Sequence, residues 1–161
     1  MKNIAVTVIV GFVTGLIISG ILFDAINYFG KSFNRVSVSW NISKAEKAYS
    51  EGRFSDSVSI YKKILSKIGT DNKLLTAKTK NNTALSIIKK IETENNISLT
   101  DYEKENSYEF PSDVAAELDD ALSLLNEAKD LYLEINEQKL YLQTSENIKI
   151  LETFKNGNLY V

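Results

Sequence analysis

The sequence predicts an all-α protein with one N-terminal transmembrane helix and a small antiparallel domain of about five helices. Three observations support this prediction. Residues 4–23 carry no charge, apolar residues recur at helical spacing through most of the remaining chain, and the 161 residues include one proline (Pro111) and seven glycines. So few prolines and glycines argue against a sheet-rich or disordered chain.

The run Ile4–Phe23 is dominated by Ile, Val, Leu and Phe. As a helix it spans roughly 30 Å, the thickness of the hydrocarbon core of a bilayer. A cleavable signal peptide is the competing interpretation, but it needs small residues one and three places before the cut, and neither Gly20 nor Ala25 has a suitable neighbour. We therefore expect a retained single-pass anchor within residues 1–30.

The side of the membrane on which the domain lies depends on flanking charges. Lys2 precedes the run, and Lys31 and Arg35 follow it. A short basic start usually stays in the cytoplasm, which favours an exterior domain, whereas the basic stretch 31–90 suits the anionic cytoplasmic leaflet. We prefer the exterior. Three N-x-S/T sequons occur at about chance frequency and do not decide the side: Asn41, Asn81 and Asn96.

Small residues recur every fourth position inside the apolar run, so they share one helix face. Such a face lets two transmembrane helices approach closely. It therefore predicts packing on a partner's helix or on a second copy of this chain, although glycine is common in membrane helices in any case. The residues are Thr7, Gly11, Gly15 and Ser19.

We expect residues 31–42 to be a juxtamembrane linker. Tyr28 and Phe29 suit the headgroup level of a bilayer, where aromatic residues gather. Phe33 and Trp40 suit either that level or the core under the first hairpin, and for Trp40 we prefer the core.

Residues 43–69 predict a helical hairpin. Ser43 and Glu46 have the spacing of a capping box, Gly52 suits the end of the first helix, and Ser55 suits the cap of the second. The second helix then places five apolar or aromatic residues on one face: Val58, Tyr61, Ile64, Leu65 and Ile68.

This hairpin resembles a tetratricopeptide repeat over about one 34-residue period. The resemblance rests on small and aromatic residues in the family's order: Ala45, Tyr49, Gly52, Phe54, Ser57, Tyr61 and Leu65. Trp40 stands one place from the family's tryptophan, Ile64 replaces a small residue, and Gly69 stands where proline is usual. The alternative is an ordinary helical hairpin in a small bundle.

The rest of the chain predicts a degenerate second repeat over residues 71–134. A helix capped by Asp71 runs to about Glu94, and another begins at Pro111 or Ser112 and runs to about Glu134. Between them, residues 95–111 form an acidic insertion, which is either a partner-binding loop or a plain solvated loop. Its candidate contact residues are Tyr102, Glu103, Glu105 and Tyr108.

Residues 136–155 predict a final helix that covers the open end of the helical stack, as solenoid proteins require. Asn136 suits its cap, and Asn156-Gly157 suits its end. The residues expected to cover the stack are Leu140, Ile148, Leu151 and Phe154.

Charge is distributed unevenly along the chain. Residues 31–90 hold thirteen basic and four acidic side chains, a net of +9, and residues 91–161 hold five and sixteen, a net of −11. This asymmetry suggests either an electrostatic interaction surface or pairing of the two halves with each other.

No catalytic chemistry is evident. The chain has no Cys and no His, which excludes thiol nucleophiles, imidazole bases and ordinary zinc ligation. Asp119 and Asp120 are adjacent on a helix and point about 100° apart, so they do not converge on one metal ion. We expect no cofactor, no nucleic-acid partner and no enzymatic activity.

The sequence therefore predicts a membrane-anchored adaptor or assembly factor that binds protein partners, themselves membrane proteins. The alternative is a structural subunit held in a membrane complex through its anchor, and a lipid-surface sensor using the basic half is a third possibility. The repeat resemblance implies a groove lined by the first helix of each repeat. Its candidate residues are Lys44, Lys47, Ala48, Glu51, Lys78, Asn81 and Asn82.

Overall fold

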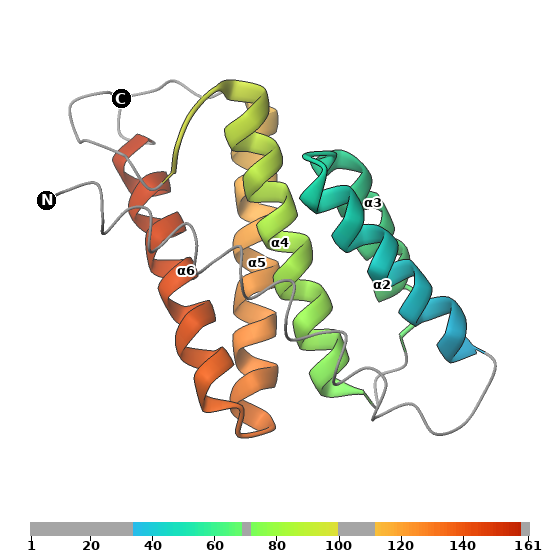
Figure 1. The fold of residues 1–161 in the computed structure, drawn as a ribbon. Coiled ribbons are helices and arrows are strands. Elements are labelled where there is room, and N and C mark those ends of the chain that lie inside the picture. The colour runs from blue at the N-terminus through green and yellow to red at the C-terminus, as the bar shows by residue number, and fades with distance from the viewer. Residues whose placement is uncertain (1–33, 69–71, 100–111, 159–161) are drawn as a thin grey trace, which may run out of the picture.

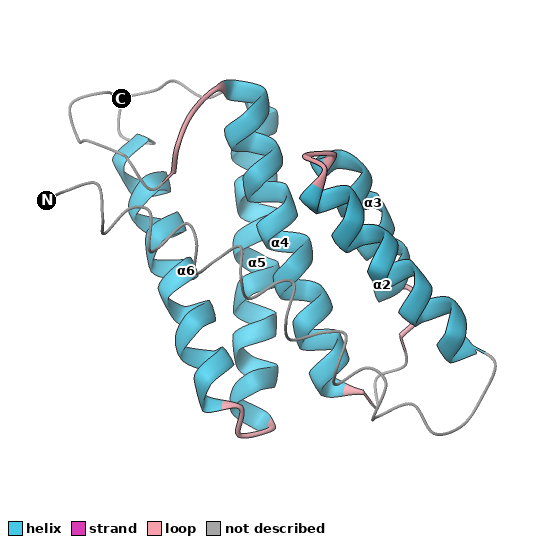
Figure 2. Cartoon of the chain, in the orientation of Figure 1, coloured by secondary structure: helices cyan, strands magenta, loops and turns pink. Residues whose placement is uncertain are grey.

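The computed structural model describes residues 34–68, 72–99 and 112–158, which form helices joined by turns (Figures 1 and 2). Within these ranges the secondary structure is all helical, as predicted. The helices are α2 (Asn34–Ser50), α3 (Phe54–Leu65), α4 (Lys73–Asn95), α5 (Ser112–Glu134) and α6 (Gln138–Asn158).

Each helix packs against the next one along the chain, so α2 to α6 form an array of sequential helix pairs. Figure 1 shows α2 in front of α3 and α4 in front of α5, with α6 beside α5. The helices α4 and α5 have 23 residues each, and they form the most extensive contact of the array. The first helix of each hairpin therefore lies on the same side of the array.

The start of α2 corrects two predictions. The helix begins at Asn34, so residues 34–42 are not a linker, and Ser43 lies in the helix interior rather than at its cap. Val38 and Ile42 are buried and extend the apolar face that continues at Ala45. Burial of this face against α3 stabilises the additional turns of helix.

The turn between α2 and α3 confirms the role of Gly52. This residue has a φ of +74°, a left-handed conformation that glycine adopts without steric cost. The cap of α3 is Arg53, whose side chain makes no capping hydrogen bond. Ser55 lies inside α3, with Oγ 3.4 Å from Glu94 Oε1, so the prediction that it caps the helix is wrong.

The boundaries of α4 depend on two asparagines. Asn72 caps the helix, because its Oδ1 accepts a hydrogen bond of 3.1 Å from the backbone N–H of Leu75. The predicted cap, Asp71, lies outside the described residues. At the other end Asn96 has a φ of +51°, the left-handed conformation that ends many helices.

The bounds of α5 confirm the predicted helix from Ser112 to Glu134. Asn136 does not cap α6. It has a φ of +60° and ends the turn after α5, where Glu137 N–H bonds to the carbonyl of Tyr132. The last helix continues to Asn158, so Asn156-Gly157 does not end it as predicted.

The core is divided along the array, and α4 contributes to every part of it. The main apolar cluster joins α4, α5 and α6 and includes Ala84, Ile91, Leu125, Leu151 and Phe154. A second cluster joins α2, α3 and α4. Ala121, Leu125 and Ala128 are completely buried on α5, at the spacing of one helix face.

Trp40 is not part of the core. Its side chain is 60% exposed, and Lys44 Nζ lies 3.6 Å from the centre of its ring. The expectation that Trp40 packs under the first hairpin is therefore wrong, because Val38 and Ile42 occupy the face of α2 that turns toward α3.

Among the described residues, no helix is both long enough and apolar enough to cross a bilayer. The predicted anchor at Ile4–Phe23 lies outside those residues, as do Tyr28, Phe29 and Phe33.

Candidate functional site

A buried polar cluster lies where α2, α3 and α4 meet. It consists of Glu46 and Tyr49 on α2, Tyr61 on α3 and Asn82 on α4. Asn82 Nδ2 lies 3.4 Å from the hydroxyl oxygen of Tyr61, to which it donates a long hydrogen bond. Both of these side chains are buried, at 5% and 1% exposure. The cluster therefore links α3 to α4 through polar groups in an otherwise apolar interface.

The position of Tyr49 follows from its packing. Its ring meets the ring of Phe54 edge to face, with 5.2 Å between centroids, and it forms a small apolar cluster with Leu85 of α4. Glu46 precedes Tyr49 by three residues on α2, so the two side chains share one helix face. That face is the one turned toward α3 and α4.

Two oxygen atoms of this cluster are buried without a hydrogen-bond partner among the described residues. They are Glu46 Oε1 and the hydroxyl oxygen of Tyr49. An unsatisfied buried polar group costs about 1–3 kcal/mol, and more when it is charged. The Glu46 residue as a whole is only partly buried, although this oxygen is not accessible. A hydrogen-bond donor that reached these oxygens after the side chains turn outward would remove this cost.

Burial changes the acidity of these groups. Desolvation raises the pKa of Glu46 from 4.5 to about 7. It also raises the pKa of Tyr49 to about 12, with a further contribution from the charge of Glu92. The pKa of Tyr61 lies above its usual range because of burial and the nearby charge of Glu46. Glu46 therefore changes its charge near neutral pH, while both tyrosines stay protonated.

Further polar side chains line the buried faces of α4. Ser86 Oγ lies 3.0 Å from Ser57 Oγ of α3, and it donates to the carbonyl of Asn82 at 2.8 Å. Thr79 and Thr83 donate in the same way to carbonyls one turn earlier in α4. These hydroxyls are satisfied within the array, so they need no external ligand.

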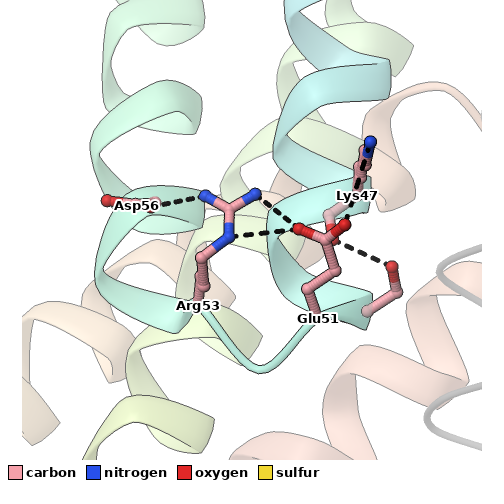
Figure 3. Close-up of polar contacts among 5 residues, drawn as sticks. Lys47, Glu51, Arg53 and Asp56 are labelled. Atoms are coloured by element: carbon pink, nitrogen blue, oxygen red, sulfur yellow. Dashed lines mark hydrogen bonds and ion pairs between the residues drawn. The ribbon is translucent and has the colours of Figure 1, made fainter.

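Three of the four groove residues predicted on α2 lie on its outer side. Lys44, Lys47 and Glu51 are exposed, and their spacing of three to four residues places them on one face. Figure 3 shows Glu51 between two cations: Arg53 Nη2 is 2.6 Å and Lys47 Nζ is 3.8 Å from its carboxylate. Arg53 also pairs with Asp56 at 2.5 Å. This outer face is a different face from the one that carries Glu46 and Tyr49.

Two of the predicted groove residues are not surface residues. Ala48 is completely buried and Asn82 is 5% exposed, so neither presents a side chain to an open groove. Lys78 and Asn81 are partly exposed on α4, and Asn81 Oδ1 accepts a hydrogen bond of 3.2 Å from Thr144 of α6. Ala48 and Asn82 therefore do not line an open groove, whereas the other predicted members keep exposed surface.

The remaining site predictions lie outside the described residues. They are the small-residue face of Thr7, Gly11, Gly15 and Ser19, and the acidic-loop residues Tyr102, Glu103, Glu105 and Tyr108.

The two oppositely charged halves of the sequence pair with each other. Lysines of α3 and α4 pair with carboxylates of α5, and Lys62 Nζ is 2.7 Å from Asp120. Lys62 lies on α3. The ion pairs that join α4 to α5 are Lys73 with Glu134, Lys80 with Glu127, and Lys90 with Glu117. Asp119 pairs instead with Lys155 of α6, so Asp119 and Asp120 point to different helices, as their sequence spacing predicts.

Metal chemistry has no evident site in the part of the chain that the structure describes. No group of three or more Asp or Glu side chains there is arranged to hold a metal ion. Comparison with known proteins gave no guide to function: no family model, no curated protein and no solved structure matches the chain.

The burial of Glu46 was not predicted, because its spacing from Ser43 matched a capping box. The available signal was its position one turn before Tyr49, on the face that also carries Ile42 and Ala45. A carboxylate on an otherwise apolar helix face is uncommon, because burying a charge costs free energy.

Proposed function

We propose that the chain is a membrane-anchored adaptor that binds a segment of a partner protein where α2 faces α4. The observation that carries this proposal is the pair of unpartnered oxygens, Glu46 Oε1 and the Tyr49 hydroxyl, among the residues that the structure describes. A partner that donates hydrogen bonds to them would offset the cost of their burial. The proposal assigns the chain no enzymatic role.

The arrangement of the helices supports this function. The first helices of the two hairpins, α2 and α4, lie on the same side of the array in Figure 1. Proteins resembling tetratricopeptide repeats bind partner segments on that side, and the proposal extends this property to the present chain. The partner segment offers a hydrogen-bond donor to the Glu46 carboxyl oxygen, and it either donates to the protonated Tyr49 hydroxyl or accepts from it.

Membrane attachment in this proposal comes from the uncharged run Ile4–Phe23. Its length matches the hydrocarbon core of a bilayer. Lys2 before the run favours an exterior domain and the basic stretch 31–90 favours the cytoplasmic side, so the proposal commits to neither side.

The test is co-purification of the full chain from its own membranes in mild detergent. The variants Glu46→Met and Tyr49→Phe remove the carboxyl and phenol oxygens with little change of shape. Both should lose the co-purifying partner, whereas Glu152→Met, at an exposed position of α6, should keep it. Unchanged partner recovery with both cluster variants would refute the assignment of this face.

The alternative function is a structural subunit held in a membrane complex through its anchor. The small residues at every fourth position of the apolar run favour it, because they allow close helix packing. Replacing residues 4–23 by an unrelated transmembrane helix separates the two functions. An adaptor keeps its partner after this exchange, and a structural subunit loses its complex.

A further inference from the structure

The first observation is an exposed aromatic residue near the start of the domain. Trp40 is 60% exposed on α2, and Lys44 Nζ lies 3.6 Å from the centre of its ring. It is the single tryptophan of the chain. An exposed tryptophan next to a lysine combines an apolar ring, an N–H donor and a positive charge, the combination that suits the interface between water and lipid.

The second observation is that two further lysines lie at the same end of the array. The helices α2 and α3 are antiparallel. Ile64, in α3, and Ile68, in the turn after α3, pack in the same apolar cluster as Val38 and Ile42 of α2. The start of α2 and the end of α3 therefore lie together. Lys63 and Lys67 flank these isoleucines and are exposed.

The charge of these lysines is not neutralised within the described residues. Lys62, in contrast, pairs with Asp120, and the lysines of α4 that face α5 have carboxylate partners. No carboxylate in the described ranges pairs with Lys44, Lys63 or Lys67. Residues 34–45 and 57–70 contain no Asp or Glu, and Asp71 is the first acidic residue after α3. The folded array thus leaves a net positive charge at this end.

The third observation is the short distance along the chain from this end to the apolar run. Ten residues, 24–33, separate Phe23 from the start of α2. Fully extended, they span at most roughly 35 Å. Trp40 lies six residues into α2, which adds about 9 Å along the helix axis. A run that spans the bilayer therefore keeps the start of α2 within roughly 35 Å of the end of that run, in reach of the bilayer surface.

We propose that the end of the array formed by Trp40, Lys44, Lys63 and Lys67 rests on an anionic bilayer surface, with the Trp40 ring at headgroup level. The inference rests on the proposed membrane anchor. Each lysine near an anionic leaflet strengthens the contact, and Trp40 fixes the depth. The contact orients the array on the membrane, so that the α2–α4 face stands at a fixed height above it.

The test uses the full chain reconstituted into vesicles, with the fluorescence of Trp40 as the signal. Because Trp40 is the single tryptophan, its emission reports this site alone. In vesicles with phosphatidylserine, the emission should shift to shorter wavelength relative to detergent, and lipids brominated near the headgroup should quench it. Vesicles of phosphatidylcholine alone should give a smaller shift and weaker quenching.

Charge variants test whether Lys63 and Lys67 make the contact with the bilayer, or whether any exposed lysine of the chain has the same effect. Lys63→Gln with Lys67→Gln should reduce the salt-sensitive part of the quenching by at least about half, since a lysine near an anionic surface contributes measurably to binding. Lys139→Gln with Lys149→Gln, at two exposed positions of α6, should leave it unchanged. Equal quenching in both lipid compositions, or an equal effect of the two lysine pairs, would overturn the proposal.

Flotation of the same vesicles separates the surface contact of Trp40 from the membrane anchor. If the chain resists extraction by alkali and floats, but bromine does not quench Trp40, the surface contact is wrong and the anchor stands. If the chain does not float with vesicles of either composition, the anchor is wrong and the inference falls with it.

Discussion

Ser57 Oγ of α3 and Ser86 Oγ of α4 lie 3.0 Å apart, and neither side chain is exposed. The two small residues allow the helices to approach closely at this point. Ser86 uses its proton for the carbonyl of Asn82, so Ser57 is the donor between the two hydroxyls. Loss of Ser86 therefore leaves the buried hydroxyl of Ser57 without a partner, whereas loss of Ser57 leaves Ser86 bonded to Asn82.

Ser86→Ala should destabilise the fold by about 1–2 kcal/mol, because the buried hydroxyl of Ser57 then loses its acceptor. Ser57→Ala should cost less, since Ser86 keeps its bond to Asn82. The double variant should cost less than the sum of the single ones, which urea unfolding can measure. Ser66→Ala, at an exposed position, is the control. Equal costs for the two buried serines would contradict the assigned direction of the bond.

Glu46 should make the stability of the fold depend on pH. Its pKa is 4.5 in an unfolded chain and about 7 in the fold, so the folded state binds the proton more tightly. The free energy of unfolding should therefore fall as pH rises from about 4.5 to about 7. The full shift corresponds to roughly 3 kcal/mol, and solvent screening of this partly buried group leaves on the order of 1–2 kcal/mol.

The measurement is thermal unfolding of Glu46→Gln and of the unaltered chain at about pH 5 and about pH 8. The amide introduced by this substitution does not titrate, so the variant should lose less stability between the two values and should be the more stable chain at the higher one. Glu152→Gln serves as the exposed control. A variant with the same pH dependence as the unaltered chain would show that Glu46 is ionised at little cost in the fold.

Gly52→Ala should destabilise the α2–α3 turn by about 1 kcal/mol. Apart from its chain neighbours, no described residue places a heavy atom within 4 Å of the added Cβ, so the cost comes from the positive φ and not from a collision. Gly52→Asn should cost less, because asparagine tolerates this conformation better than alanine. Chemical denaturation of both variants tests the order, and a larger loss with asparagine would point to a different cause.

Lys90 and Glu117 link α4 to α5, and their hydrogen bond holds the pKa of Lys90 above its usual range. A double-mutant cycle with Lys90→Ala and Glu117→Ala should give a coupling of about 0.5–1 kcal/mol, because both groups are partly exposed. Added salt should reduce this coupling. A cycle with Lys90 and Glu127, which pairs with Lys80 instead, should give a coupling near zero.

Much of the helical pattern was predictable because it depends on local sequence. The helix from Ser112 to Glu134 follows directly after Pro111, and its completely buried residues Ala121, Leu125 and Ala128 repeat at helical spacing. Gly52 was equally predictable, since the end of a helix favours a residue that adopts positive φ at little cost. Both signals need no knowledge of the neighbouring helices.

Other boundaries were not predictable from local sequence. Ser43 and Glu46 form a capping box only if the preceding residues are not helical, and the packing of Val38 and Ile42 on α3 makes those residues helical. Asparagine suits both a helix cap and a left-handed residue after a helix, so the sequence alone did not assign Asn136. The polar cluster likewise requires α3 and α4 to be placed around Glu46.

The ion pairs between the halves of the chain also set an order for biosynthesis. Translation completes α2, α3 and α4 before any carboxylate of α5 exists, so Lys73, Lys80 and Lys90 first emerge without their α5 partners. During this interval α4 also lacks the cover of α5 over Ala84 and Ile91. The nascent chain is therefore a cationic, partly uncovered intermediate, which acquires its final charge balance only when α5 leaves the ribosome.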